Sequence, residues 1–412
     1  MVNFERFVLD NGLKVLIHQD RSTPIAVVNV LYNVGARDEH PDHTGFAHLF
    51  EHLMFEGSVN IPGYDNTLQL AGGENNAFTN NDITNYYLTL PRHNLETALW
   101  LESDRMLGLS FSEEKLRIQK NVVTEEFRQS YLNQPYGDVW LLLRPLLYKV
   151  HPYQWPTIGK SIEHIKSANL AQVEEFFFKY YRPNNAILVV SGNVEAEPTL
   201  ELIRKWFAEI PSGKPIVRDL PAEPPQTQAR KLAVERDVPY DEIYLAFHTG
   251  TRLDDNFYTT DVITDILAGG QSGRLRENLV KKRKIFSETN AWISGSFDKG
   301  FLAITGRLNP GQDIHTAREA LWEELMALAY GEIDDYEFQK IKNKIEANHT
   351  FAEAGILSRS VNLAWYECLG DAALLNEQIQ KYFDLTREEV QETAKNIFRP
   401  EQVSELHYLA KK

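Results

Sequence analysis

The sequence predicts an α+β protein built from two repeated halves. Strand-like and helix-like patterns alternate in each half, and short sequences recur across the chain. At 412 residues the chain exceeds one typical domain, so two domains of about 200 residues are expected. The 43% hydrophobic content is sufficient for globular cores.

Strands are expected at the start of the N-terminal half and helices after them. Asp10-Asn11-Gly12 is a hairpin signal, and apolar residues at helical spacing indicate helices further along. The expected strands are 7–9, 13–18, 25–34 and 186–190, and the expected helices include 95–107 and 168–181.

An internal repeat links the two halves. Gly35-Ala36-Arg37 resembles Gly250-Thr251-Arg252, 215 positions later, and Arg182-Pro183 resembles Arg399-Pro400, 217 positions later. The two halves are therefore interpreted as copies.

The boundary between the halves is expected in the Pro-rich stretch 211–225, where fixed φ angles and missing N–H donors prevent regular structure. We therefore expect an N-terminal domain over 1–215 and a C-terminal domain over 216–412.

The segment His48-Leu49-Phe50-Glu51-His52 is the main candidate for chemistry. On a helix, His48 and His52 share a face and Glu51 lies beside them. Two neutral imidazoles can bind Zn²⁺ and leave a position for water, from which Glu51 could take a proton, although such a site also tolerates Mn²⁺ or Co²⁺. The order His-x-x-Glu-His is the inverzincin signature. The alternative is a half-exposed helix with two surface histidines.

The second half lacks this motif. A shift of 215 positions places only aliphatic residues where the motif has its polar ones, namely Ile263, Ile266 and Leu267. A metal site is therefore expected in the first half alone.

A third metal ligand is expected from the predicted helix 111–131, which has a possible N-cap at Ser112. Glu126 follows an apolar run, and Glu125 points about 100° away from it on a helix. A Glu-Glu pair is more often solvated, so the residues alone leave open whether either carboxylate is a ligand.

Several segments of the chain resemble the pitrilysin/insulinase family of zinc peptidases, in its short-chain processing-peptidase branch. They are Val34–Ser58, Gly72–Tyr87, Asn121–Gln129 and Gly269–Leu275, and the similarity covers essentially the whole chain. The resemblance implies a mostly antiparallel sheet with helices packed on it in each half. It also implies that the two units form half of a clamshell around a chamber.

The resemblance also implies the roles of the site residues. The family has a third ligand some 75 residues beyond the second histidine, which selects Glu126, 74 residues beyond His52. One zinc ion per chain and Glu51 as the base follow from the same likeness. The chain departs from the family at Gln119, where many members have a supporting glutamate.

Peptide binding is expected at a strand that follows the Gly72-Gly73 turn. Its residues are Asn75, Asn76, Ala77 and Phe78. An exposed edge strand can accept an extended peptide through backbone hydrogen bonds. The alternative is an ordinary edge strand or an Asn-rich loop.

Arg359 and Tyr366 form a second candidate group, seven residues apart on one helical face. This spacing also fits a snorkelling arginine and a half-buried ring. Similar family members use such a pair, from the half opposite the zinc, to hold substrate near the scissile carbonyl. The resemblance thus implies a homodimer in which each subunit completes the other's site, or otherwise a heterodimer with a zinc-less partner.

Charge, apolar runs and cysteine content indicate which partners and which cellular compartment to expect. The net charge of −15 disfavours nucleic acid, and the absence of 18 consecutive apolar residues disfavours a membrane span. Cys368 is the single cysteine, so no intrachain disulfide can form. Residues 1–10 contain no signal-like apolar run, so a cytoplasmic protein is expected, or a periplasmic one if a signal was removed.

The predicted function is zinc-dependent endopeptidase activity on short or unfolded peptides inside an enclosed chamber. The alternatives are a subunit of a heterodimeric peptidase that needs a zinc-less partner, and a non-catalytic structural subunit. A zinc hydrolase acting on a non-peptide amide is a third.

Overall fold

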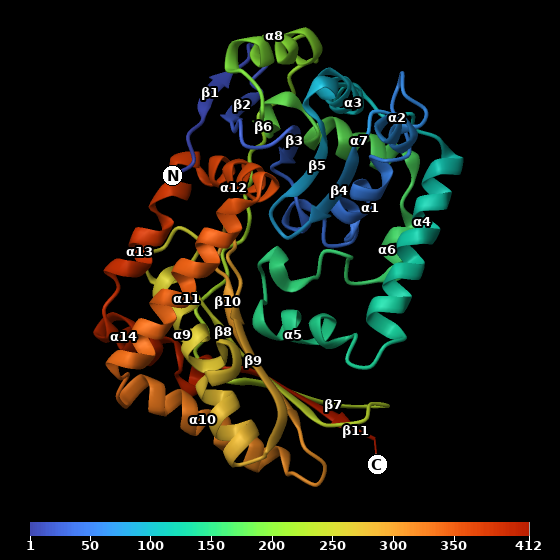
Figure 1. Ribbon diagram of the computed structural model, residues 1–412. Coiled ribbons are helices and arrows are strands. Elements are labelled where there is room, and N and C mark those ends of the chain that lie inside the picture. Colours follow the sequence, from blue (N-terminus) through green and yellow to red (C-terminus); the bar gives the residue numbers. More distant parts are fainter. Residues whose placement is uncertain (412) are drawn as a thin grey trace. The chain divides into compact units, whose positions relative to one another are not determined.

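The computed structural model describes residues 1–411, which form two compact units (Figure 1). Among the described residues, the first unit comprises 1–128, 155–220 and 350–377, and the second comprises 129–154, 221–349 and 378–411. Each unit has one mixed, mostly antiparallel sheet with helices packed on it, which confirms the predicted fold class. Because both units are discontinuous in sequence, they are not the two predicted domains. The repeat boundary at residue 215 stays a prediction.

The first unit contains a six-stranded sheet in the order β1-β2-β6-β3-β5-β4. Only β2 and β6 pair in parallel. The strands are β1 (Glu5–Val8), β2 (Lys14–Gln19), β3 (Ile25–Tyr32), β4 (Glu74–Thr79), β5 (Thr84–Pro91) and β6 (Ala186–Gly192). The helices are α1 (Phe46–Leu53), α2 (Tyr64–Leu70), α3 (Leu95–Leu107), α4 (Glu113–Phe127), α6 (Ile162–Ser167), α7 (Leu170–Tyr180), α8 (Ala196–Phe207) and α12 (Ile356–Leu369).

The second unit contains a five-stranded sheet in the order β7-β11-β8-β10-β9. Only β7 and β11 pair in parallel. The strands are β7 (Arg230–Arg236), β8 (Glu242–His248), β9 (Phe286–Ile293), β10 (Phe301–Leu308) and β11 (Ser404–Ala410). The helices are α5 (Val139–Leu147), α9 (Asn256–Ala268), α10 (Ile314–Tyr330), α13 (Gln378–Asp384), α14 (Arg387–Ile397) and most of α11 (Asp335–Ala354).

The two sheets are topological copies of each other. Strands β2, β6, β3, β5 and β4 occur in the same order as β7, β11, β8, β10 and β9, with the parallel pair in the same place. Strand β1 is the addition in the first sheet. The shared topology supports the repeat inferred from the sequence.

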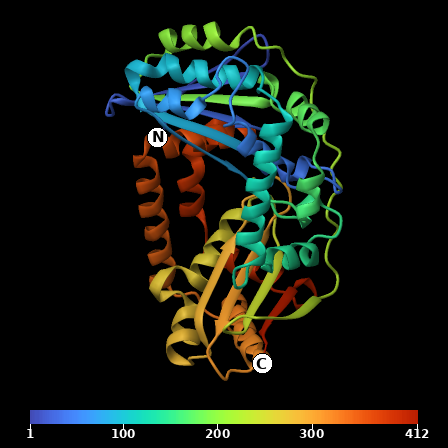
Figure 2. The same ribbon diagram turned by 90° about the vertical axis from the view of Figure 1, so that its right-hand side faces the viewer.

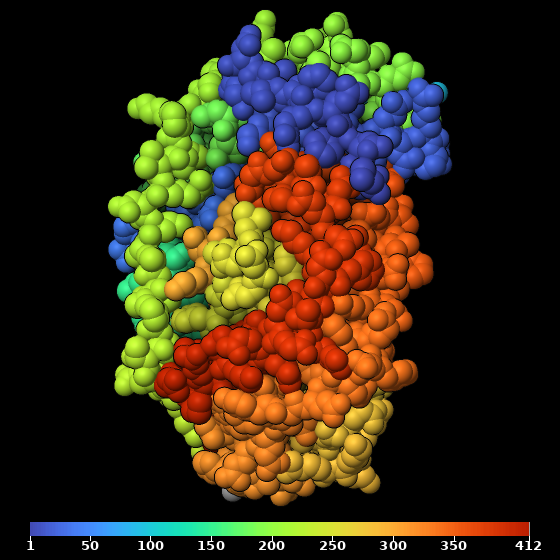
Figure 3. All heavy atoms as spheres, turned by 90° about the vertical axis from the view of Figure 1, so that its left-hand side faces the viewer, coloured from blue at the N-terminus to red at the C-terminus, as the bar shows by residue number. Residues whose placement is uncertain are grey.

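Each sheet is covered by a helix from the other half of the sequence. Helix α12 packs on β2, β3 and β6, and α5 packs on the corresponding strands β7, β8 and β11. In the first unit, α3 and α8 lie on the face opposite α12 (Figure 2). Figure 3 shows orange-red residues of the C-terminal half against blue residues of the N-terminus. Within the first unit, Arg6 Nη2 lies 2.8 Å from Glu367 Oε2 of α12.

The local elements follow the chemistry of their residues. Gly12 has a φ of 87°, which permits the tight turn between β1 and β2, and its N–H donates to Leu9 O at 2.8 Å. The Pro-rich stretch 211–225 contains no helix or strand, as predicted. Among residues 1–411, helices long and apolar enough to span a membrane are absent.

Candidate metal centre

Helix α1 has an apolar side that anchors it and a polar side that remains accessible. Phe46, Leu49 and Phe50 are buried, and the Phe50 ring stacks on Phe176 of α7 with centroids 5.0 Å apart. Positions 48 and 52 fall on the opposite side of the helix, because each lies two residues from an anchoring residue. The fold therefore holds α1 by its apolar side and leaves both histidines available.

The start of α1 is fixed by a buried carboxylate. Glu39 accepts hydrogen bonds from Gly45 N and Ala47 N, each at 2.9 Å, and from Trp155 Nε1 at 3.1 Å. Gly45 has a φ of 90°, which favours glycine. Burial raises the pKa of Glu39 to about 8, although these N–H donors act in the opposite direction. The carboxylate satisfies N–H groups that a helix terminus leaves unpaired.

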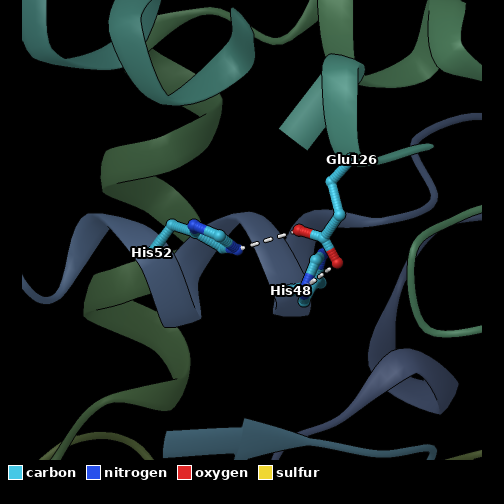
Figure 4. Close-up of side chains that lie close together, drawn as sticks. All are labelled: His48, His52 and Glu126. Atoms are coloured by element: carbon cyan, nitrogen blue, oxygen red, sulfur yellow. Dashed lines mark ion pairs between the residues drawn. The ribbon is translucent and has the colours of Figure 1, made fainter. Parts of the chain in front are cut away.

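Helix α4 supplies the third side chain. The Ser112 hydroxyl accepts a hydrogen bond from Lys115 N at 3.2 Å, which confirms the predicted N-cap. Leu116, Val123 and Phe127 are buried. Because α4 packs against α1, Glu126 reaches the two histidines (Figure 4).

His48, His52 and Glu126 meet with their ligand atoms facing one another. His48 Nε2 lies 3.6 Å from Glu126 Oε1, and His52 Nε2 lies 3.4 Å from Glu126 Oε2 (Figure 4). Tetrahedral zinc bonds of about 2.0–2.2 Å separate neighbouring ligand atoms by about 3.3–3.6 Å. Among residues 1–411 this is the single group of three or more His, Cys, Asp or Glu side chains whose ligand atoms all lie within 4.8 Å of one another. The donor set and its spacing fit a zinc ion.

The protonation states also suit metal binding. Burial lowers the pKa of His48, although the charge of Glu126 partly opposes this. Contact with His52 lowers the pKa of Glu126. A neutral imidazole and an ionised carboxylate are the states that a metal ion requires.

Glu51 lies beside the histidines and is held by one hydroxyl group. Thr79 Oγ1, at the end of β4, donates a hydrogen bond to Glu51 Oε2 at 2.6 Å. The charge of Glu51 also acts to raise the pKa of His48, but this effect is smaller than those of burial, Glu126 and His52. The carboxylate therefore lies close to the cluster without being part of it.

Strand β4 is the outermost strand of its sheet, beside β5. Residues 75–78 lie on it, as the edge-strand prediction requires. Asn75 Nδ2 donates to Asp65 Oδ1 at 2.8 Å, and Phe78 is 36% exposed. The outer backbone edge of β4 has no strand paired with it among residues 1–411.

The other two α4 residues considered from the sequence do not join the cluster. Glu125 forms an ion pair with Arg128. Gln119 Nε2 donates to Glu56 Oε1, and Gln119 Oε1 is buried without a partner. His48 Nδ1 is also buried without a partner among the described residues, whereas metal-bound histidines usually donate a second hydrogen bond.

Arg359 and Tyr366 lie on α12, away from the elements that build the cluster. Helix α12 packs on β2, β3 and β6, whereas α1 packs on β4, β5 and α4. Arg359 forms an ion pair with Asp20, and Tyr366 is buried. Their predicted contact with substrate stays a prediction.

Sequence reasoning missed Glu39 and Thr79. Glu39 acts on α1 from across a loop, and no spacing rule connects it to the helix. Thr79 ends the strand in which peptide binding is predicted, but its contact with Glu51 was not predicted. The alternation of side chains along β4 could have indicated that Thr79 faces the same side as Asn75 and Ala77.

Two family models match separate parts of the chain. The model described as Insulinase (Peptidase family M16) matches residues 14–142, which include the whole cluster. The model described as Peptidase M16 inactive domain matches residues 167–345, which include α9.

Similar proteins extend over most of the chain. The zinc protease PqqE of Helicobacter pylori is 32% identical over 349 residues, covering 82% of this chain and 77% of that protein. YmxG, an uncharacterized zinc protease of Bacillus subtilis, is 24% identical over 397 residues, covering 96% of this chain and 95% of that protein. The crystal structure of a protease from Helicobacter pylori matches with a TM-score of 0.94 and 27% identity, covering 99% of this chain and 100% of that one.

Proposed function

Because the chain belongs to the peptidase M16 family of insulinase and pitrilysin, we propose that it is a zinc-dependent endopeptidase acting on short or unfolded peptides. The observation that carries the proposal is the spacing of 3.4 Å and 3.6 Å between the Glu126 oxygens and the two histidine nitrogens. The names of the relatives as zinc proteases support the choice of metal.

His48, His52 and Glu126 hold the metal in this proposal, as an inverzincin site. When bound, zinc supplies Lewis-acid activation of water and of the scissile carbonyl. Glu51 takes the proton of the attacking water on its carboxylate and returns it to the nitrogen of the leaving amine. The position of Glu51 on the same helix as His48 and His52, where its charge acts on His48, supports this role.

The substrate is proposed to bind as an additional strand on β4, through residues 75–78. Backbone pairing at a free edge suits extended peptides of varied sequence. An enclosed chamber would restrict the substrates to short or unfolded chains. Arg359 and Tyr366 are proposed to contact the substrate in a neighbouring subunit, which requires the release of Arg359 from Asp20.

The proposed assembly is a homodimer, and the proposed compartment is the cytoplasm. A heterodimer with a zinc-less subunit is the second candidate. In that case the isolated chain would bind zinc without turning over peptides.

The test is cleavage of a mixed panel of unstructured peptides by the purified, zinc-loaded chain. Turnover that requires Glu51, measured against the Glu51→Gln variant, is the expected result. Bound zinc without turnover would point to the heterodimer. Failure to bind zinc, or equal turnover by Glu51→Gln, would contradict the proposal.

A further inference from the structure

We propose that Thr79 is a positioning residue that orients Glu51 and links the peptide-binding edge strand to the reaction. The inference rests on the proposed function, because Glu51 must be the base for its orientation to matter. Thr79 acts through Glu51 and does not itself contact the reacting atoms.

The contact between Thr79 and Glu51 is short and specific. Thr79 Oγ1 donates to Glu51 Oε2 at 2.6 Å, a length typical of a hydroxyl bound to an ionised carboxylate. It is the sole hydrogen bond to the Glu51 side chain within residues 1–411. With Oε2 engaged, Oε1 is the oxygen left to take a proton from water.

Thr79 is itself held in place by the turn that follows it. Asn80 Oδ1 accepts hydrogen bonds from Asp82 N at 2.7 Å and Ile83 N at 2.9 Å, which fixes the turn between β4 and β5. Asn80 O accepts from Ala36 N at 3.1 Å, and Asn81 O accepts from Arg37 N at 2.9 Å.

This turn is therefore attached to the loop that leads into α1. That loop also contains Glu39, which binds the first N–H groups of α1. The donor Thr79 and the acceptor Glu51 are thus anchored to the same short segment, 36–39. Such a frame keeps a side chain within the narrow geometry that a catalytic group needs.

The same strand carries the peptide-binding edge in the proposed function. Residues 75–78 offer their backbone to a peptide, and the next residue, Thr79, holds the base. A peptide that orders β4 therefore also orders the donor to Glu51. Loss of the hydroxyl should slow the chemical step more than it weakens peptide binding.

Thr89 provides a matched control in the same hairpin. Its hydroxyl donates to Glu74 Oε1 at 3.2 Å, an exposed contact outside the proposed machinery. Replacing Thr89 by Val removes the same group from a neighbouring strand.

The experiment compares kcat, KM and zinc content for the full chain and three variants: Thr79→Val, Thr79→Ser and Thr89→Val. Thr79→Val should lower kcat by about 10- to 100-fold, which is the change in rate expected when a hydrogen bond to a charged group is lost. KM and zinc content should stay unchanged. Thr79→Ser should recover most of the loss, and Thr89→Val should match the unmodified chain. Unchanged kcat in Thr79→Val, or equal losses in Thr79→Val and Thr79→Ser, would overturn the inference.

Crystal structures of the zinc-loaded chain and of Thr79→Val give a readout independent of activity. The Glu51 carboxylate should leave its position in the variant, and an unmoved carboxylate would overturn the inference. If the unmodified chain shows no Glu51-dependent turnover, the proposed function fails, but this comparison still decides whether Thr79 orients Glu51.

Discussion

Helices α1 and α9 occupy equivalent places in two copies of one sheet, but their side chains have opposite chemistry. Helix α1 packs beside the edge strand β4, and α9 packs beside the corresponding edge strand β9. The metal-binding candidates His48, His52 and Glu126 and the proposed base Glu51 correspond by position to Ile263, Leu267, Ile341 and Ile266, respectively. All four aliphatic residues are buried in one apolar cluster.

The comparison shows that the fold does not require polar residues at these positions. The second copy fills them with aliphatic side chains that are 0–2% exposed, whereas the side chains of His48, His52 and Glu126 are 14%, 25% and 41% exposed. Polar side chains stabilise a fold little at such places. Their presence in the first copy is therefore best explained by chemistry.

The largest expected effect is a loss of peptide turnover when α1 is changed but not when α9 is changed. Glu51→Gln should lower kcat by about 10²- to 10⁴-fold, because an amide cannot accept the proton of water, and the zinc content should remain. Ile266→Val, at the corresponding position of α9, should leave turnover unchanged. Steady-state cleavage of an unstructured peptide measures both. Equal losses in the two variants would remove the functional distinction between the helices.

A smaller effect is expected on the free energy of unfolding when residues of α1 and α9 are exchanged. Ile263→His should lower the free energy of unfolding by about 3 kcal/mol, because it buries an unpaired polar ring in an apolar cluster. His48→Ile, the reverse exchange, should abolish zinc binding but cost little stability, since an aliphatic residue fits the equivalent site. Urea unfolding and metal analysis of both variants measure this. An unchanged free energy of unfolding in Ile263→His would show that the second copy tolerates a histidine and lacks one for another reason.

The smallest effect concerns the acids that precede the two helices. Glu39 is buried with its pKa raised to about 8, whereas Asp254, at the corresponding position before α9, is exposed. From pH 4.5 to about 8 the folded chain keeps a proton on Glu39 that the unfolded chain has released. The stabilisation from Glu39 is therefore complete below that window and falls by at most about 1.4 kcal/mol per pH unit as the pH rises.

Urea unfolding of the unmodified chain and of Glu39→Gln between pH 4.5 and about 8 checks whether the stabilisation from Glu39 falls as the pH rises. The stability difference between them should shrink as the pH rises. A difference that grows with pH would mean that Glu39 is ionised in the folded chain and acts as a charged cap.

The local elements could be predicted from the sequence, because they depend on short-range patterns. Helix α3 spans Leu95–Leu107 as its apolar spacing indicated, and the Asp10-Asn11-Gly12 turn joins two paired strands. The proposed ligands His48 and His52 come from a motif of five residues, whereas Glu126 is selected over Glu125 by the family resemblance. The repeat also separated the half with the motif from the half without it.

Two features could not be predicted in this way: which helix covers each sheet, and which residues support the proposed site. Helix α12 belongs to the second half of the sequence but packs on the first sheet, and no periodicity states which sheet a helix covers. Glu39 and Thr79 act through hydrogen bonds across a loop and across 28 positions of chain. Such contacts depend on the tertiary fold, which apolar spacing does not encode.

Anomalous diffraction at the zinc absorption edge, from crystals of the zinc-loaded chain, would locate the metal and decide whether the first copy of the fold holds it. We expect one peak per chain, about 2.0–2.2 Å from His48 Nε2, His52 Nε2 and a Glu126 oxygen, and none at α9. A peak elsewhere, or no peak at these three residues, would contradict the claim that one copy of the fold holds the metal and the other does not.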